Sequence, residues 1–207
     1  MSRAHCIRMA LAEAQAVLQR LMADESLLKN VELSGELLAD VFRAGGRAFS
    51  CGNGGSMCDA IHFAEELSGK FRKNRPALPA LAISDPGHIS CVANDFGYEC
   101  IFSRFLEAHS REGDVLLAIT TSGNSGNILN AAKTARERGV RVIGMTGKQE
   151  CRLAELSDIL LATPAGSYSD RVQEMHIKLI HIMIELVERE LFPENYGPAE
   201  QKHPSER

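Results

Sequence analysis

Two short turns rich in glycine, serine and threonine constrain the fold of this chain most. Each turn lies between an apolar run typical of a buried strand and an amphipathic run typical of a helix. Their sequences are Cys51-Gly-Asn-Gly-Gly-Ser56 and Thr120-Thr-Ser-Gly-Asn-Ser125. Strand, tight turn and helix in this order form the repeating unit of α/β proteins. We therefore expect these turns to connect the strands of a parallel sheet to helices that cover it.

The composition of the two turns suits a phosphate group. Glycines let the backbone approach an anion, hydroxyl groups donate to its oxygens, and a helix that follows offers unpaired amides at its positive end. One such turn alone is more simply a capped strand-to-helix connection. Two of them in one chain, the second with Thr120, Thr121, Ser122 and Ser125, favour a phosphate site.

Periodicity predicts the remaining elements. Apolar residues recur at helical spacing over residues 7–21 and again over 37–42, before the first strand. Strand-like runs follow at 47–51, 80–84, 115–120, 140–146 and 159–163, and a long helix is predicted over 170–192. The prediction is an α/β fold: a doubly wound, five-stranded parallel sheet flanked by helices, with two N-terminal helices and a long C-terminal helix. Ligands of such sheets bind beyond the carboxyl ends of the strands, where both turns fall.

Length and composition indicate one domain. A chain of 207 residues, 44% of them hydrophobic, can bury a complete core, and we assign residues 1–193 to it. Residues 194–207 are polar and rich in proline and glutamate, so they are predicted to form a disordered tail.

Charge and cysteine content exclude several classes of partner. The net charge of −4, without a long basic run, argues against nucleic acid and against a membrane surface. The six cysteines form no C-x-x-C pair, which predicts reduced thiols and a cytoplasmic protein. No signal peptide is expected, because residues 1–8 contain no uninterrupted apolar run. No membrane span is expected, because Lys178, His181 and Glu185 interrupt the most apolar stretch near the C-terminus.

Two nucleotide-binding motifs fail on single residues. The third glycine of the dinucleotide fingerprint would fall on Met57, and Met145 replaces the lysine of a Walker-like spacing that begins at Gly139. The chain is therefore expected to use no nucleotide cofactor.

Three reactive residues follow the first turn at intervals of four. Cys58, His62 and Glu66 would share one face of a helix. The histidine and glutamate could hold a divalent metal, the cysteine and histidine could be a nucleophile and its base, or the glutamate could be a lone general base. The simplest alternative is a helix whose apolar residues pack inward while His62 and Glu66 face solvent.

The predicted last helix carries two further candidates. Gln173 and His181 are eight residues apart, which corresponds to about 12 Å of rise. Their side chains could converge only on a group midway between them. On this helix alone, a histidine among many apolar residues is more often a core or interface residue than a ligand.

Longer motifs resemble those of a known family. They are Ser50-Cys-Gly-Asn-Gly-Gly-Ser, Asp59-Ala-Ile-His-Phe-Ala-Glu-Glu-Leu, Asn74-Arg-Pro, Asn94-Asp-Phe-Gly, Gly113-Asp-Val-Leu-Leu, Thr121-Ser-Gly-Asn-Ser and Arg171-Val-Gln-Glu-Met-His-Ile-Lys. Over residues 7 to 192 the chain is similar to the bacterial phosphoheptose isomerases, which have a sugar-isomerase (SIS) domain. That resemblance implies interconversion of sedoheptulose 7-phosphate and D-glycero-D-manno-heptose 7-phosphate, the first step toward the ADP-heptose of lipopolysaccharide, by a cytoplasmic homotetramer with sites at its subunit interfaces.

The resemblance also implies the roles of individual residues. It implies one zinc ion per subunit at His62, Glu66, Gln173 and His181, with Glu66 and His181 as the acid/base pair. The implied substrate contacts are Asn53, Gly54, Gly55, Ser56, Glu66, Asn94, Asp95, Thr120, Thr121, Ser122, Ser125 and Gln173. Lys70 departs from the family pattern, where arginine is frequent, so a bidentate phosphate contact is not expected there.

A relative without catalytic activity provides the alternative function. The similar protein that promotes assembly of the replication initiator DnaA keeps the fold and the tetramer. It lacks the acidic residue at the position of Glu66 and the histidine at that of His181, and it has arginine where this chain has Ser122. Because all three residues are present here, the enzyme is the favoured interpretation.

Overall fold

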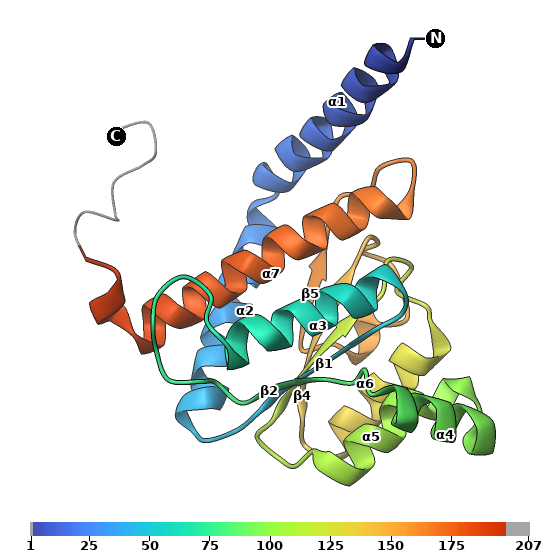
Figure 1. Ribbon diagram of the computed structural model, residues 1–207, viewed down its shortest axis with the longest axis vertical. Coiled ribbons are helices and arrows are strands. Elements are labelled where there is room, and N and C mark those ends of the chain that lie inside the picture. Colours follow the sequence, from blue (N-terminus) through green and yellow to red (C-terminus); the bar gives the residue numbers. More distant parts are fainter. Residues whose placement is uncertain (1, 198–207) are drawn as a thin grey trace.

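The computed structural model describes residues 2–197 and shows two layers of helices around one sheet (Figure 1). Two helices, α1 (Arg3–Met22) and α2 (Glu25–Arg43), precede the sheet. The elements that follow are β1 (Ala48–Gly52), α3 (Gly55–Ser68), β2 (Ala80–Ala82), α4 (Pro86–Phe96), η1 (Tyr98–Cys100), α5 (Ile101–His109), β3 (Val115–Ile119), α6 (Gly126–Glu137), β4 (Arg141–Thr146), η2 (Ala154–Leu156), β5 (Ile159–Ala162), α7 (Ser169–Leu191) and η3 (Pro193–Asn195).

The five strands are parallel and run in the order β2-β1-β3-β4-β5. The strand order therefore reverses between β1 and β3, where Gly52 pairs in register with Ile119. Both glycine-rich turns begin at this point, because one follows β1 and the other follows β3. The predicted doubly wound sheet is confirmed, and the observed strand ends differ from the predicted ones by at most two residues.

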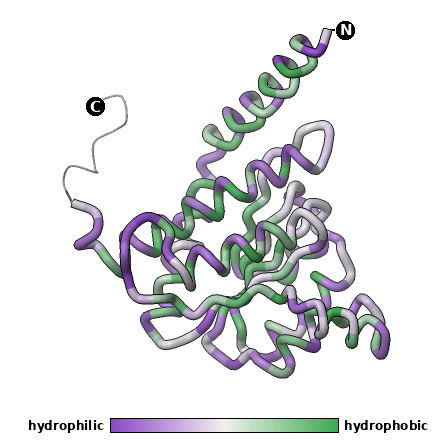
Figure 2. The backbone as a smooth tube through the Cα atoms, viewed as in Figure 1, coloured by the Kyte–Doolittle hydropathy of each residue, from purple (hydrophilic) through white to green (hydrophobic). Residues whose placement is uncertain are grey.

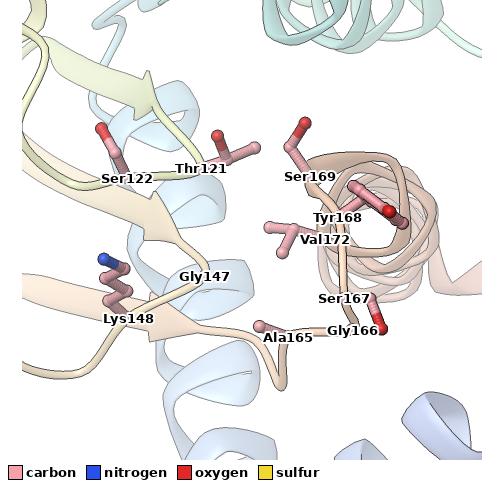
Figure 3. Close-up of a pocket in the computed structure, with 10 residues that line it drawn as sticks. All are labelled: Thr121, Ser122, Gly147, Lys148, Ala165, Gly166, Ser167, Tyr168, Ser169 and Val172. Atoms are coloured by element: carbon pink, nitrogen blue, oxygen red, sulfur yellow. The ribbon is translucent and has the colours of Figure 1, made fainter.

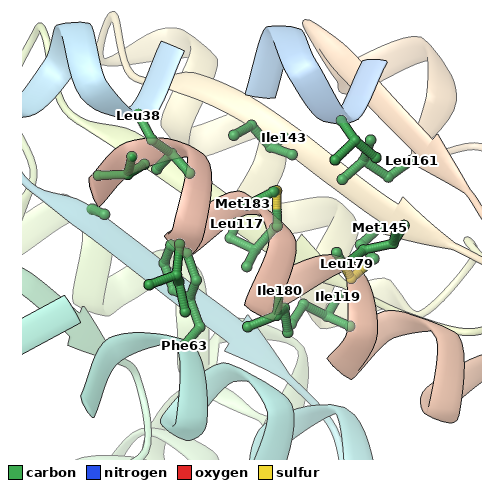
Figure 4. Close-up of a cluster of buried hydrophobic side chains, with 14 of the residues drawn as sticks. Leu38, Phe63, Leu117, Ile119, Ile143, Met145, Leu161, Leu179, Ile180 and Met183 are labelled. Atoms are coloured by element: carbon green, nitrogen blue, oxygen red, sulfur yellow. The ribbon is translucent and has the colours of Figure 1, made fainter. Parts of the chain in front are cut away.

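Each strand presents alternate residues to two separate cores. Helices α2, α3 and α7 cover one face, and Figure 4 shows Phe63 of α3 and Ile180 of α7 packed against Leu117 and Ile119 of β3. Helices α4, α5 and α6 cover the other face, where Leu116 and Ala118 of β3 are buried. The tube in Figure 2 is hydrophobic along the strands, as expected for a sheet buried on both sides.

The end of the described chain differs from the prediction. Instead of a disordered tail from residue 194, Pro193–Asn195 form a short 3-10 helix and the Tyr196 side chain is only 7% exposed. The Tyr196 hydroxyl donates to the Glu188 carboxylate at 2.7 Å, so a buried ring and a hydrogen bond offset the entropy of ordering this segment. The rest of the predicted tail, residues 198–207, lies outside the described residues.

Candidate active site

The two glycine-rich turns meet around a small polar cavity. Its volume is about 80 Å³, which suits a group of the size of a phosphate. The lining residues come from both turns, from the end of β3 and from α7: Asn53, Ser56, Ile119, Thr120, Thr121, Ser125 and Gln173. Six of these seven side chains carry a hydroxyl or an amide group, and none is charged. The predicted convergence of the two turns is thus found in the structure.

The helices that leave these turns lack side-chain caps. Ser2, Asp24 and Asp85 accept hydrogen bonds from the first turns of α1, α2 and α4, but Gly54 and Ser125, at the starts of α3 and α6, cap nothing. No side chain therefore competes with an anion for the start of α3, although the Ser56 and Met57 amides already donate to the Asn53 and Gly54 carbonyls at 3.0 Å. Gly54 has φ +55°, and this left-handed conformation turns the chain from β1 into α3.

Hydroxyl groups of the second turn contact one another rather than the helix. The Thr120 hydroxyl lies 3.0 Å from that of Ser125 and 3.3 Å from that of Ser122. Thr120 is buried and Ser122 is exposed at the rim. An anion that enters the cavity would replace these mutual contacts with stronger, charge-assisted hydrogen bonds.

Amide side chains hold the first turn in place. Asn53 and the buried Asn127 exchange two hydrogen bonds of 2.9 Å, and the Tyr98 hydroxyl donates to Asn53 at 3.1 Å. Asn127 and Tyr98 are not among the predicted site residues. The only sequence signal for Asn127 is a polar amide at a position where helix α6 faces the sheet. Glu99, also absent from the predicted site residues, places its carboxylate against Gly126 in the first turn of α6, where it complements the helix dipole.

Two of the predicted substrate residues lie elsewhere. Asn94 and Asp95 are on α4, where the Asn94 amide donates to the Asp95 carboxylate at 2.7 Å and both residues are exposed. They do not line the polar cavity of this chain. Their contact with substrate therefore stays a prediction.

A wider cavity adjoins the polar one. It has a volume of about 270 Å³ and lies between the ends of β3 and β4 and the start of α7 (Figure 3). Thr121 lines both cavities. Lys148 lines the wider cavity and is the only cationic residue among the lining residues of the two. The two cavities together provide room for a phosphate and for part of the molecule that carries it.

Farther along α3, three predicted residues come together. One ligand atom each from His62, Glu66 and His181 lies within 4.8 Å of the other two. The Nε2 atoms of the histidines are 2.9 Å apart, and His62 Nε2 is 3.5 Å from Glu66 Oε1. The three side chains are half-buried where α3 packs on α7, with 36% of the His62 side chain and 17% of the Glu66 side chain exposed. The simplest alternative, in which His62 and Glu66 face solvent, therefore does not describe the cluster.

Neighbouring groups orient the cluster. Glu65 Oε1 lies 3.1 Å from His62 Nδ1. This contact favours the tautomer of His62 with its proton on Nδ1, so Nε2 is unprotonated and can bind a metal or accept a proton. The Phe71 ring packs 5.7 Å from the His181 ring. Burial, with a smaller contribution from His62, lowers the pKa of His181 below its usual value. His181 is therefore neutral near pH 7 and can both donate and accept a proton.

Gln173 lies apart from this cluster. Its amide packs against Gly55 at the start of α3, where a Cβ on Gly55 would approach it to 2.6 Å. Because α3 and α7 run in the same direction, Gln173 sits beside the polar cavity and His181 sits beside His62. The structure thus joins three of the four predicted metal ligands, and Gln173 joins the predicted phosphate contacts instead.

The nucleophile interpretation of Cys58 gains nothing from the structure. Cys58 is exposed and is not part of the cluster around His62. All six cysteines are free, as predicted.

Comparison with known proteins agrees with this fold. The sequence model of the SIS domain family matches residues 11–147. The chain therefore belongs to the SIS domain proteins, a class consistent with its parallel sheet and its two glycine-rich turns.

The particular family follows from closer relatives. The chain is 57% identical over 185 residues to the phosphoheptose isomerase of Aeromonas salmonicida, covering 89% of this chain and 96% of that protein. The Vibrio cholerae phosphoheptose isomerase is 52% identical, covering 89% and 97%. The solved phosphoheptose isomerase of Neisseria gonorrhoeae superposes with a TM-score of 0.84 at 34% identity, covering 90% of this chain and 99% of that one. The chain belongs to the phosphoheptose isomerase family.

None of the helices in residues 2–197 combines the length and the hydrophobicity of a transmembrane segment.

Proposed function

We propose that this chain converts sedoheptulose 7-phosphate to D-glycero-D-manno-heptose 7-phosphate, the first step of ADP-heptose synthesis for lipopolysaccharide, in the cytoplasm. The observation that carries the proposal is the arrangement of groups along α3. Its start borders the hydroxyl-lined cavity, and its last turns carry the cluster with Glu66. Ser56 and Glu66 are about 15 Å apart along the helix axis, which suits a long phosphorylated sugar.

An aldose–ketose isomerase has to move a proton between adjacent carbons and another between their oxygens. We assign the first task to Glu66, which takes the proton from carbon and returns it to the neighbouring carbon. His181 serves the oxygens, since a neutral imidazole can give one proton and accept another. The phosphate is held away from the reacting carbons, so its binding energy orients them without taking part in the chemistry.

The substrate contacts that we propose follow the cavity. Asn53, Gly54, Gly55, Ser56, Thr120, Thr121, Ser122, Ser125 and Gln173 would hold the phosphate and the adjoining carbons. Asn94 and Asp95 lie outside the cavity of this chain, so their proposed contact requires the site of another subunit.

The cluster of two histidines and one carboxylate fits zinc. Nitrogen and oxygen donors of this kind are its usual ligands, and the Glu65 contact frees the His62 Nε2 atom for one. When bound, zinc would polarise the sugar carbonyl. The proposed fourth ligand, Gln173, packs on Gly55 in its own chain, so it would reach the metal only by leaving that contact or from a neighbouring subunit. Zinc affinity that rises with subunit assembly would support this arrangement.

Exposed apolar residues support a homotetramer. Helix α1 projects from the body in Figure 1, and Ile7 and Leu11 on it are 61% and 66% exposed. Large apolar side chains on a projecting helix are typical of a surface that another chain covers.

Turnover of sedoheptulose 7-phosphate by the purified protein, with and without a chelator, tests the proposal. We expect product formation that the chelator reduces and added zinc restores. Absence of turnover under all conditions would contradict the proposal. The alternative, binding of the replication initiator DnaA, would then be tested by direct binding; the presence of Glu66, Ser122 and His181 and the isomerase relatives weigh against it.

A further inference from the structure

A fully buried ion pair lies behind the reactive cluster. The side chains of Arg75, in the loop after α3, and Glu188, on α7, are each 0% exposed, and Arg75 Nε lies 2.8 Å from Glu188 Oε1. The other carboxylate oxygen of Glu188 accepts the hydrogen bond from the Tyr196 hydroxyl. Burial, followed by this contact with Glu188, raises the pKa of Tyr196, so the phenol keeps its proton. We name these three residues the buried clamp.

The arginine of the clamp closes the end of the helix that carries Glu66. Arg75 Nη2 donates to the backbone carbonyl of Glu66 at 2.7 Å, and Nη1 donates to that of Leu67 at 2.7 Å and that of Gly69 at 3.3 Å. The last carbonyls of a helix have no partner within the helix, and a cation there also complements the helix dipole. Arg75 therefore fixes the last turn of α3, and with it the backbone of Glu66.

The glutamate of the clamp ties this turn to the helix that carries His181. Glu188 is two turns beyond His181 on α7. A second ion pair, between Arg72 Nη1 and Glu185 Oε2 at 2.7 Å, joins the same loop to α7. Phe71, which precedes Arg72 in this loop, packs 5.7 Å from the His181 ring. The loop in Figure 1 that connects α3 to β2 is thus attached to both helices of the reactive cluster.

A contribution to the stability of the fold does not by itself explain this network. A buried ion pair is often no more stable than apolar residues of the same volume, because both charges must be desolvated. Its rigid geometry is the property that apolar packing would not supply, since Nε, Nη1 and Nη2 of one planar group all donate in fixed directions.

We propose that the buried clamp positions the Glu66 carboxylate relative to the His181 ring, with Arg75 and Glu188 as positioning residues. Tyr196 extends the clamp to the end of the described chain by fixing the Glu188 carboxylate. This inference depends on the roles of Glu66 and His181 in the proposed function. It assigns no contact with substrate to the clamp itself.

Conservative variants test the clamp without opening a cavity. Arg75→Lys keeps the charge opposite Glu188 but cannot reach Glu188 and the two helix carbonyls together. Tyr196→Phe removes one hydroxyl. Arg43→Lys is the matched control, because Arg43 also pairs with a glutamate of α7, Glu190, but on the surface and without touching α3. Circular dichroism establishes whether each variant is folded. If Arg75→Lys does not fold, Tyr196→Phe alone tests the inference.

Kinetics separates positioning from a general structural role. For Arg75→Lys we expect kcat to fall about tenfold or more while KM for the phosphosugar changes by less than about twofold, since the phosphate cavity lies at the other end of α3. Tyr196→Phe should show the same pattern with a smaller loss, and Arg43→Lys should match the wild type. Unchanged kcat in both clamp variants, or a loss expressed only in KM, would overturn the inference.

Zinc affinity provides a readout that does not require turnover. Titration of the metal-free protein with zinc should show weaker binding by about tenfold in Arg75→Lys and unchanged binding in Arg43→Lys. If the wild type does not turn over the heptose phosphate, the proposed function fails, and the zinc titration still decides the inference. Equal zinc affinity in Arg75→Lys and wild type would then overturn it.

Discussion

The Nε2 atoms of His62 and His181 lie 2.9 Å apart, although the residues are 119 positions apart in the chain. Two imidazole nitrogens at this distance can share one proton or face one metal ion, but they cannot both be protonated without repulsion. The packing of α3 on α7 creates this contact, and Glu66, one turn beyond His62, completes it.

Replacement of Glu66 with glutamine should abolish isomerisation. The amide has nearly the same shape but cannot take a proton from carbon, so we expect kcat to fall by at least about a hundredfold with the fold intact. Steady-state assays of heptose phosphate turnover measure the loss. The neighbouring Glu65→Gln is the control and should lose less than Glu66→Gln. A loss of less than about tenfold in Glu66→Gln would exclude Glu66 as the base.

The double variant Ser122→Ala, Ser125→Ala should bind phosphosugar much more weakly. Hydrogen bonds to a charged group contribute about 1.5–3 kcal/mol each, so the loss is easily measured by calorimetry. Ser103→Ala on α5 is the control, because its hydroxyl donates to the Cys100 carbonyl away from the cavity. Unchanged affinity in the double variant would place the phosphate elsewhere.

Removal of the His181 ring should remove zinc. The cluster then retains only His62 and Glu66 from this group, too few ligands for a stable site. Metal analysis after dialysis should find stoichiometric zinc in the wild type and in the control His109→Ala, and little in His181→Ala. Tightly bound zinc in His181→Ala would rule out the proposed site and leave His181 as an acid/base or packing residue.

Buried His176 should make the fold sensitive to acid. Its side chain is 0% exposed, and neither ring nitrogen has a hydrogen bond of good geometry to the described residues, although the Thr146 backbone opposes the shift slightly. Burial lowers the pKa of His176 from 6.5 to about 4. The unfolded chain therefore binds a proton below pH 6.5 that the folded chain binds only near pH 4.

The free energy of unfolding should accordingly decrease as the pH falls from 6.5 to about 4, and His176 should account for about 3 kcal/mol of this decrease. Below pH 4 the contribution of His176 should not change further. Urea unfolding at several pH values measures the effect. His176→Leu should show a smaller decrease than the wild type, and the exposed His5→Gln should behave as the wild type. An identical decrease in His176→Leu would show that other groups cause the acid sensitivity.

Local sequence patterns are sufficient to predict the order and the extent of most elements. Strand runs such as residues 115–120 are apolar on both faces, and the last helix repeats apolar positions at helical spacing, so both patterns are local. The position of the two turns at neighbouring strand ends followed from the same alternation. The C-terminal segment does not follow from a local pattern, because Tyr196 is ordered by its contact with Glu188 and not by its neighbours in sequence.

Which side chains meet depends on how distant segments pack together. Helical spacing placed His62 and Glu66 on one face, but only the axial register of α3 against α7 brought His181 to them and left Gln173 beside Gly55. That register is set by core residues such as Phe63 and Ile180, which are far apart in the chain. For the same reason Arg75 and Glu188 gave no joint signal: a charge on an apolar face finds its partner only when distant segments pack together.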